Sequence, residues 1–103
     1  AKERMVVIEQ VASRPGQSSV ATFRFGMGYG ALIACVAANK TPMHLVTPNK
    51  WKKHFNLSSD KDTSRQLAIQ RFPDHYDRFS LKKHDGRAEA SLICLWAAEV
   101  LVK

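Results

Sequence analysis

Two short apolar runs separated by a long helical segment place the strongest constraint on the fold of this chain. Residues 5–12 read Met-Val-Val-Ile-Glu-Gln-Val-Ala, a run typical of a buried strand, and residues 43–46 form a second such run. Between them, apolar residues recur at helical spacing over residues 20–39, and Ser18 or Ser19 is the predicted N-cap of this helix. Strands joined by a helix must be parallel, with a right-handed crossover. We therefore predict a β-α-β unit at the start of the chain.

Three further helices are predicted after the second strand. Pro48 at a first helical position predicts a short helix, and a second helix begins within residues 58–60 and is ended by Pro73. After a charged, irregular connection, the last helix begins at residue 84 or 85. The order β-α-β-α-α-α predicts an α/β fold in which all 103 residues belong to one partial domain. Two parallel strands alone leave both sheet edges open, so the chain looks like part of a larger α/β unit.

The charge balance favours a polyanionic partner. Sixteen Lys and Arg against nine Asp and Glu give a net charge of +7 and a pI near 9.8. Such an excess favours nucleic acid, because neutralising phosphates releases condensed counterions. The sequence shows no signal-peptide pattern, and no uninterrupted apolar run approaches the ~18 residues that span a bilayer. We therefore expect a cytoplasmic protein without a membrane partner.

Four residues are expected in the core. Cys35 and Cys94 each lie inside an apolar run, where a reduced core thiol is favoured over a disulfide in a cytosolic chain. Trp96 and Phe72 are also predicted to be core residues.

Three carboxylates are the candidate catalytic and metal-binding residues. Glu9 interrupts a Val and Ile run near the carboxyl end of its strand, where ligand sites of open α/β sheets collect. The alternative is a Glu turned into solvent at a strand end. Asp85 and Glu89 are four residues apart and share one helix face. Asp85 could instead cap its helix, whereas Glu89 interrupts an apolar stripe.

Carboxylates that converge from a strand end and a helix turn suit magnesium. Mg²⁺ prefers oxygen ligands and keeps several waters. Two such ions ~4 Å apart can clamp the attacking water and the leaving oxygen of a phosphodiester. We therefore expect Glu9 and Glu89 to lie close enough to share a divalent ion, with Asp85 nearby.

Four motifs, in order, resemble RuvC-like Holliday-junction resolvases. Residues 6–11 (VVIEQV) are similar to the strand that bears the family's second catalytic carboxylate, and residues 25–30 (FGMGYG) resemble the start of its next helix. Residues 46–53 (VTPNKWKK) are similar to the strand and basic turn that follow. Residues 86–90 (GRAEA) resemble the last acidic motif of phage-type members. The matches extend over almost the whole chain.

The resemblance implies a truncated RNase H-like fold and structure-selective cleavage of branched DNA with Mg²⁺ or Mn²⁺, as in DNA recombination and repair. By this resemblance, Glu9 corresponds to the catalytic carboxylate on the strand and Glu89 to the last catalytic carboxylate, on the helix. Asp85 corresponds to the remaining catalytic acid. Many relatives carry the paired acid three residues before the last, where this chain has Gly86. His84 could act on the water or the phosphate, the alternative being a solvated histidine.

The family's first catalytic Asp lies on a strand that this sequence does not include. The family begins with a three-stranded meander bearing that Asp, whereas this chain begins at what resembles the end of the following helix. We therefore expect residues 1–103 alone to be inactive, and an apolar sheet edge beside the first strand to drive self-association. The alternative function is a non-catalytic nucleic-acid-binding or dimerisation module derived from an RNase H-like domain.

A glycine-containing helix and several basic residues indicate which partners the protein could bind. Relatives pair through the helix that carries Gly26, Gly28 and Gly30, which implies a homodimer, with close packing inside one subunit as the alternative. Basic residues beside an aromatic suit a phosphate backbone with a stacking platform, although Trp51 could instead lie in the core beneath a solvated basic face. The candidate residues for binding branched or double-stranded DNA are Arg14, Arg24, Lys50, Lys52, Lys53, Lys82, Lys83 and Arg87.

Overall fold

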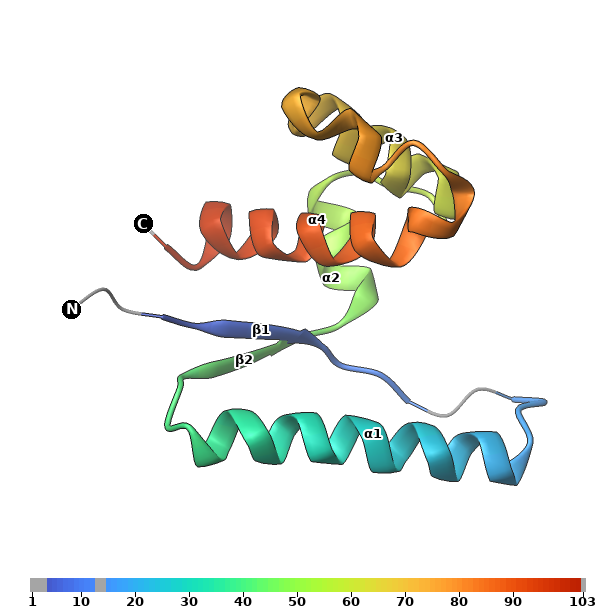
Figure 1. The fold of residues 1–103 in the computed structure, drawn as a ribbon, viewed down its shortest axis with the longest axis vertical. Helices are drawn as coiled ribbons and strands as arrows, with labels where there is room; N and C mark the ends of the chain where they lie inside the picture. Colours follow the sequence, from blue (N-terminus) through green and yellow to red (C-terminus); the bar gives the residue numbers. More distant parts are fainter. Residues whose placement is uncertain (1–3, 13–14, 103) are drawn as a thin grey trace. The chain divides into compact units, whose positions relative to one another are not determined.

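The computed structural model describes residues 4–12 and 15–102, which form an α/β structure with a two-stranded sheet (Figure 1). By the packing of its backbone the chain divides into two compact units, residues 1–46 and 47–103.

The N-terminal unit is the predicted β-α-β unit. Strand β1 (Val6–Glu9) pairs in parallel with β2 (Met43–Val46), with Val6 opposite Met43 and Glu9 opposite Val46. Helix α1 (Ser19–Ala38) connects them. The parallel pairing and the bounds of β2 confirm the prediction. Strand β1 is shorter than the predicted run because its partner ends at Val46, and the amide of Gln10 makes the last hydrogen bond, to Val46 O at 2.7 Å.

Both ends of α1 follow the sequence signals. The Ser18 hydroxyl accepts a hydrogen bond from the Ala21 amide at 3.1 Å, which confirms one of the two predicted N-caps. Asn39 is the C-cap, and Lys40 after it has a φ of 53°, in the left-handed region in which many helices end.

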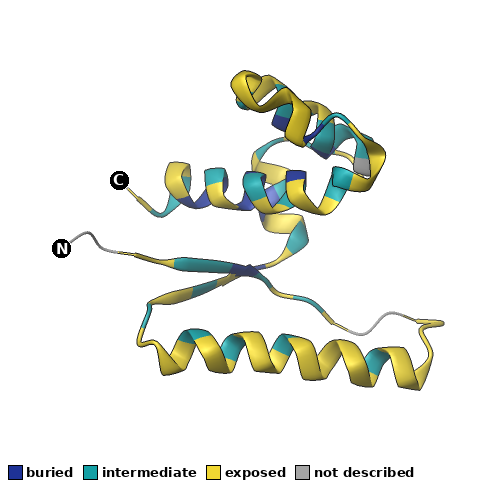
Figure 2. Ribbon diagram, viewed as in Figure 1, coloured by how far each residue is buried: buried dark blue, intermediate teal, exposed yellow. Residues whose placement is uncertain are grey.

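Helix α1 carries no buried residue (Figure 2). An added Cβ at Gly26, Gly28 or Gly30 would meet no described atom within 4 Å, so these glycines do not serve close packing inside the subunit. Cys35 is a free thiol, as expected, but it is exposed, so its placement in the core was wrong.

Helix α1 is also long and apolar enough to cross a membrane, by length and composition. Its 20 residues include a window with a mean hydropathy of 1.5, although Arg24 interrupts the apolar run. The sequence-based exclusion missed this helix because it counted only uninterrupted apolar residues. Core helices of soluble proteins and signal sequences share this composition, so it assigns no location.

The C-terminal unit contains the three predicted helices. They are α2 (Pro48–His54), α3 (Lys61–Arg71) and α4 (Asp85–Val100). Pro48 occupies the first turn of α2, and α3 ends before Pro73, as predicted. The connection expected to be irregular contains two 3₁₀ segments, η1 (Pro73–Arg78) and η2 (Lys82–His84).

Two tryptophans and one face of α4 form the core of this unit. Trp51 is 0% exposed and Trp96 is 1% exposed, and the buried stripe of α4 is visible in Figure 2. Trp51 therefore lies in the core, and its alternative role as an exposed stacking platform was wrong. Phe72 is only half-buried and packs against Phe79 with ring centroids 6.1 Å apart. The buried residues of α4 are Ala88, Leu92, Ile93, Trp96 and Ala97.

Truncating Leu92 should destabilise the C-terminal unit. Leu92 is fully buried, so we expect Leu92→Ala to lower the free energy of unfolding by ~2–5 kcal/mol, through lost burial and the cavity left behind. Leu81→Ala is the matched control, because Leu81 is 52% exposed. Urea denaturation followed by circular dichroism measures both, and equal losses would contradict the assigned core.

Candidate functional site

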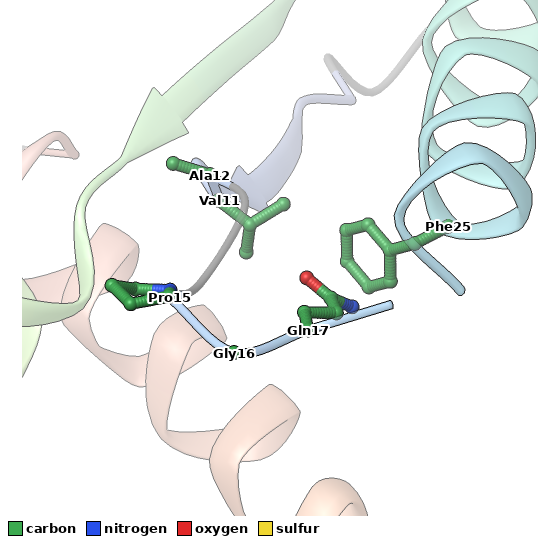
Figure 3. Close-up of a pocket in the computed structure, with 6 residues that line it drawn as sticks. All are labelled: Val11, Ala12, Pro15, Gly16, Gln17 and Phe25. Atoms are coloured by element: carbon green, nitrogen blue, oxygen red, sulfur yellow. The ribbon is translucent and has the colours of Figure 1, made fainter. Parts of the chain in front are cut away.

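Glu9 lies at the carboxyl end of its strand, as predicted. It is the last residue of β1, and its side chain is half-exposed. Beyond the strand, a cavity of about 520 Å³ opens between Val11 and Ala12 on one side and Phe25 of α1 on the other (Figure 3). The loop residues Pro15, Gly16 and Gln17 complete its lining.

Of Arg14 and Arg24, both predicted to bind DNA, the structure describes only Arg24. Arg14 lies outside the described residues. Arg24 belongs to the second turn of α1, and it is exposed.

Asp85 and Glu89 lie one turn apart at the start of α4, as predicted. Asp85 is the first helical residue, after the N-cap His84, and its Oδ1 accepts a hydrogen bond from the Gly86 amide at 2.8 Å. It is therefore not the cap that the alternative proposed, although a carboxylate in the first turn suits the helix dipole.

Glu89 is flanked by the buried core of α4 and has a cationic partner. Ala88 and Leu92 beside it are fully buried, whereas the Glu89 side chain is 24% exposed. Its Oε2 lies 3.7 Å from Nζ of Lys52 on α2. An acid beside the core requires a counter-charge, which is here a lysine from another helix.

These two carboxylates fit a magnesium ion by the chemistry of their donors. Both offer oxygen, which Mg²⁺ prefers, and neighbouring turns of a helix present them on one side. Within residues 4–12 and 15–102, however, no three His, Cys, Asp or Glu side chains are grouped so that they could hold a metal ion. Asp85 and Glu89 would therefore supply only part of a ligand set. Glu9 belongs to the other unit.

His84 closes the turn that precedes α4. Its Nδ1 accepts a hydrogen bond from the Leu81 amide at 3.2 Å. Partial desolvation, followed by the charges of Arg87, Lys83 and Arg65, lowers the pKa of His84 below its ordinary value. The ring is half-buried, and its Nδ1 is engaged in the turn.

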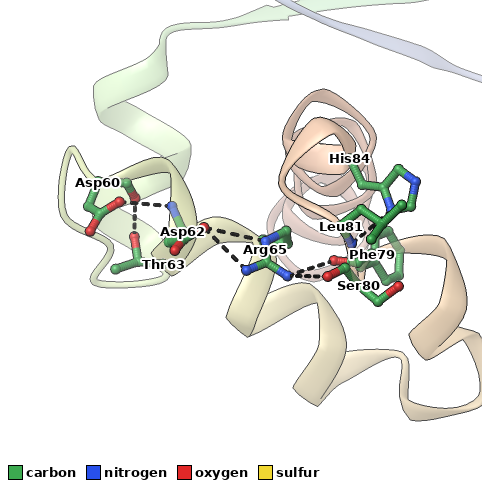
Figure 4. A network of polar contacts seen from close by, with 8 residues as sticks. All are labelled: Asp60, Asp62, Thr63, Arg65, Phe79, Ser80, Leu81 and His84. Carbon is green, nitrogen blue, oxygen red and sulfur yellow. Dashed lines mark hydrogen bonds and ion pairs between the residues drawn. The ribbon is translucent and has the colours of Figure 1, made fainter.

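Arg65 holds the chain segment that leads to the acidic motif (Figure 4). Its Nη1 donates hydrogen bonds to the carbonyl oxygens of Phe79 and Ser80, at 3.1 and 2.9 Å, and its side chain is 12% exposed. Nη2 also pairs with Asp62 at 3.3 Å. Sequence reasoning missed this residue, and the spacing of Asp62 and Arg65 by three positions was its one local signal.

The basic residues predicted to bind DNA have different environments. Nζ of Lys50 lies 5.9 Å from the centre of the Trp96 ring, and Nζ of Lys52 lies 5.6 Å from that of Trp51. Arg87 donates a hydrogen bond to the Arg78 carbonyl at 3.1 Å. Four of these lysines are exposed, Lys50 and Lys53 on α2 and Lys82 and Lys83 on η2.

A polar cavity of about 550 Å³ lies beside α2, and sequence reasoning missed it. Asn56, in the left-handed conformation with a φ of 58°, turns the chain after α2 and so brings the next residues back towards the helix. Asn directly after a helix is a known signal for such a turn. The lining residues are Pro48, Asn49, Lys52, Lys53, Asn56, Leu57, Ser58 and Ser59.

A second ionic cluster joins the three helices of the C-terminal unit. Glu99 of α4 accepts from His54 Nε2 at 2.8 Å and from Arg71 Nη1 at 3.2 Å. The hydrogen bond from His54, and then the charge of Arg71, lower the pKa of Glu99. These contacts link the three helices at their exposed edge.

Comparison of the chain with models of protein families and with curated proteins found no match. A functional assignment therefore depends on the motifs of the sequence and on the arrangement of the described side chains.

Replacing Arg65 should loosen the segment before α4. Arg65→Met removes two hydrogen bonds from a charged donor, and we expect a loss of about 1.5–3 kcal/mol in the free energy of unfolding. Hydrogen exchange of the amides at residues 79–84 should also accelerate. Arg71→Met, on the same helix but 46% exposed, should cost less than about 1 kcal/mol. Unchanged exchange in Arg65→Met would contradict the role assigned to Arg65.

Proposed function

We propose that this chain is part of a Mg²⁺- or Mn²⁺-dependent, structure-selective DNA endonuclease of the Holliday-junction resolvase type, with a truncated RNase H-like fold. The observation that carries the proposal is the acidic pair Asp85 and Glu89 at the start of α4, with Glu89 inside the last of four motifs that follow the family's order and Asp85 directly before it. The parallel β-α-β unit with an acid at the end of β1 supports the proposal.

In this proposal Glu9, Asp85 and Glu89 are the metal ligands. The ion, when bound, polarises the phosphodiester and activates a water. The half-buried position of Glu89 limits its side-chain freedom and keeps its carboxylate at the helix surface. Arg65 orders the segment before α4. Because Nδ1 of His84 accepts a hydrogen bond from the Leu81 amide, Nε2 carries the ring proton, and it is the proposed hydrogen-bond donor to the phosphate.

The proposed partner is branched or double-stranded DNA, bound by a homodimer in the cytoplasm. The net charge of +7 supports binding through backbone phosphates. Exposed cations precede the acidic pair in the sequence, on α2 and on η2. Because Trp51 is buried, binding would depend on charge rather than on stacking at this ring.

The second candidate function is a non-catalytic nucleic-acid-binding or dimerisation module. It is favoured by the fact that no group of three possible metal ligands gathers among the described residues. Cleavage of a branched substrate distinguishes the two candidates, because a binding module would retain junction affinity without any metal-dependent product.

Glu89→Gln should abolish cleavage of a four-way DNA junction in Mg²⁺, since an amide is a weaker ligand for this ion. The assay uses residues 1–103, either covalently joined to or mixed with a peptide that supplies an Asp-bearing strand of the family type. We expect at least a ~10²-fold loss of rate, the scale of losing one transition-state contact. Glu99→Gln is the matched control, because Glu99 lies on the same helix and also has cationic partners. Equal rates in the two variants would exclude the metal role of Glu89.

Binding to a four-way junction should weaken steeply with salt. If about four phosphates are neutralised, log K should fall with log salt at a slope near −3.6. Fluorescence anisotropy in Ca²⁺, between low and moderate salt, measures the slope. A slope near zero, or equal affinity for an acidic protein, would remove nucleic acid from the proposed partners.

A further inference from the structure

Lys52 contacts two different features of the C-terminal unit. Its Nζ lies 3.7 Å from Oε2 of Glu89, and its side chain also lines the polar cavity beside α2. The Lys52 side chain is 27% exposed, so neither position buries the ammonium completely. A lysine carries a compact charge on one flexible four-carbon stem, so it can exchange between such neighbouring positions.

The cavity offers donors suited to a phosphate group. Lys53 supplies a second ammonium, Asn49 and Asn56 supply amides, and Ser59 supplies a hydroxyl. The Ser58 hydroxyl already accepts a hydrogen bond from the Asp60 amide at 3.2 Å. No Asp or Glu is among the lining residues. Ammonium, amide and hydroxyl donors without a competing carboxylate bind backbone phosphate oxygens.

We propose that Lys52 couples the binding of a backbone phosphate in this cavity to the binding of a divalent metal ion at Glu89. Without a phosphate, the ammonium pairs with Glu89 and competes with the metal ion for that carboxylate. A phosphate in the cavity attracts the ammonium and leaves Glu89 available to the ion. Lys52 is thus a positioning residue. This inference rests on the proposed metal-ligand role of Glu89.

Coupling of this kind is reciprocal. If phosphate raises the affinity for the metal ion, the metal ion raises the affinity for phosphate by the same factor. The protein would therefore acquire its metal ion preferentially when a DNA backbone is already bound.

The test measures Mn²⁺ affinity by electron paramagnetic resonance of the free ion, with and without a short oligothymidylate. Without oligonucleotide, Lys52→Met should bind Mn²⁺ about two- to fivefold more tightly than the wild type, the factor set by a partly exposed ion pair. The oligonucleotide should raise the Mn²⁺ affinity of the wild type by a similar factor and leave that of Lys52→Met unchanged.

Two further variants control the experiment. Lys53→Met removes a charge from the same cavity without touching the pair with Glu89, so it should weaken oligonucleotide binding and keep the wild-type Mn²⁺ affinity. Lys52→Arg retains the charge and should restore the coupling. Circular dichroism of each variant confirms that it is folded.

The outcomes separate this inference from the proposed function. Equal Mn²⁺ affinities of wild type and Lys52→Met without oligonucleotide, or coupling that persists in Lys52→Met, would overturn the role of Lys52 while leaving junction cleavage and its loss in Glu89→Gln intact. Absence of both Mn²⁺ binding and junction cleavage would overturn the proposed function as well.

Discussion

The burial of Trp51 and Trp96 is the constraint on which the arrangement of the candidate site depends. Trp51 comes from α2 and Trp96 from α4, two helices that pack together. Once both rings are fixed in the core, the rotation of each helix is fixed too. Lys52 then emerges at the edge of the core beside Glu89, which lies two turns before Trp96. The acid is therefore held by packing that has no part in its chemistry.

Local signals predicted most of the fold, because the features that set element ends act over a few residues. Ser18, Pro48 and Pro73 each stand where an element was expected to begin or end. The 3₁₀ segments were not predicted, since their charged sequence has no helical period. In the site, the shared helix turn of Asp85 and Glu89 followed from spacing alone. The Lys52–Glu89 pair did not, because it joins separate helices and depends on how they pack.

The predicted burial of the two cysteines was wrong, because an apolar run does not show which side of a helix faces the core. Helix α1 is apolar around most of its circumference, so its pattern names no side for a core, and the structure leaves Cys35 exposed. In α4, Cys94 lies in an apolar run between the buried Ile93 and Trp96, yet it is also exposed, which corrects its expected place in the core. Helical period separates these neighbours: a residue one position from a buried one turns by about 100°. Trp51 shows the converse, since a ring among lysines still occupies the core.

The exposed thiols of Cys35 and Cys94 are natural attachment sites for a spectroscopic distance measurement. One lies in each compact unit, and the described residues contain no other cysteine. Nitroxide spin labels attached to these two thiols would need no engineered attachment site, because each thiol is solvent-accessible and on a helix that fixes the label's base. Dipolar spectroscopy of the doubly labelled protein would then follow the distance between the units as metal ion or DNA is added.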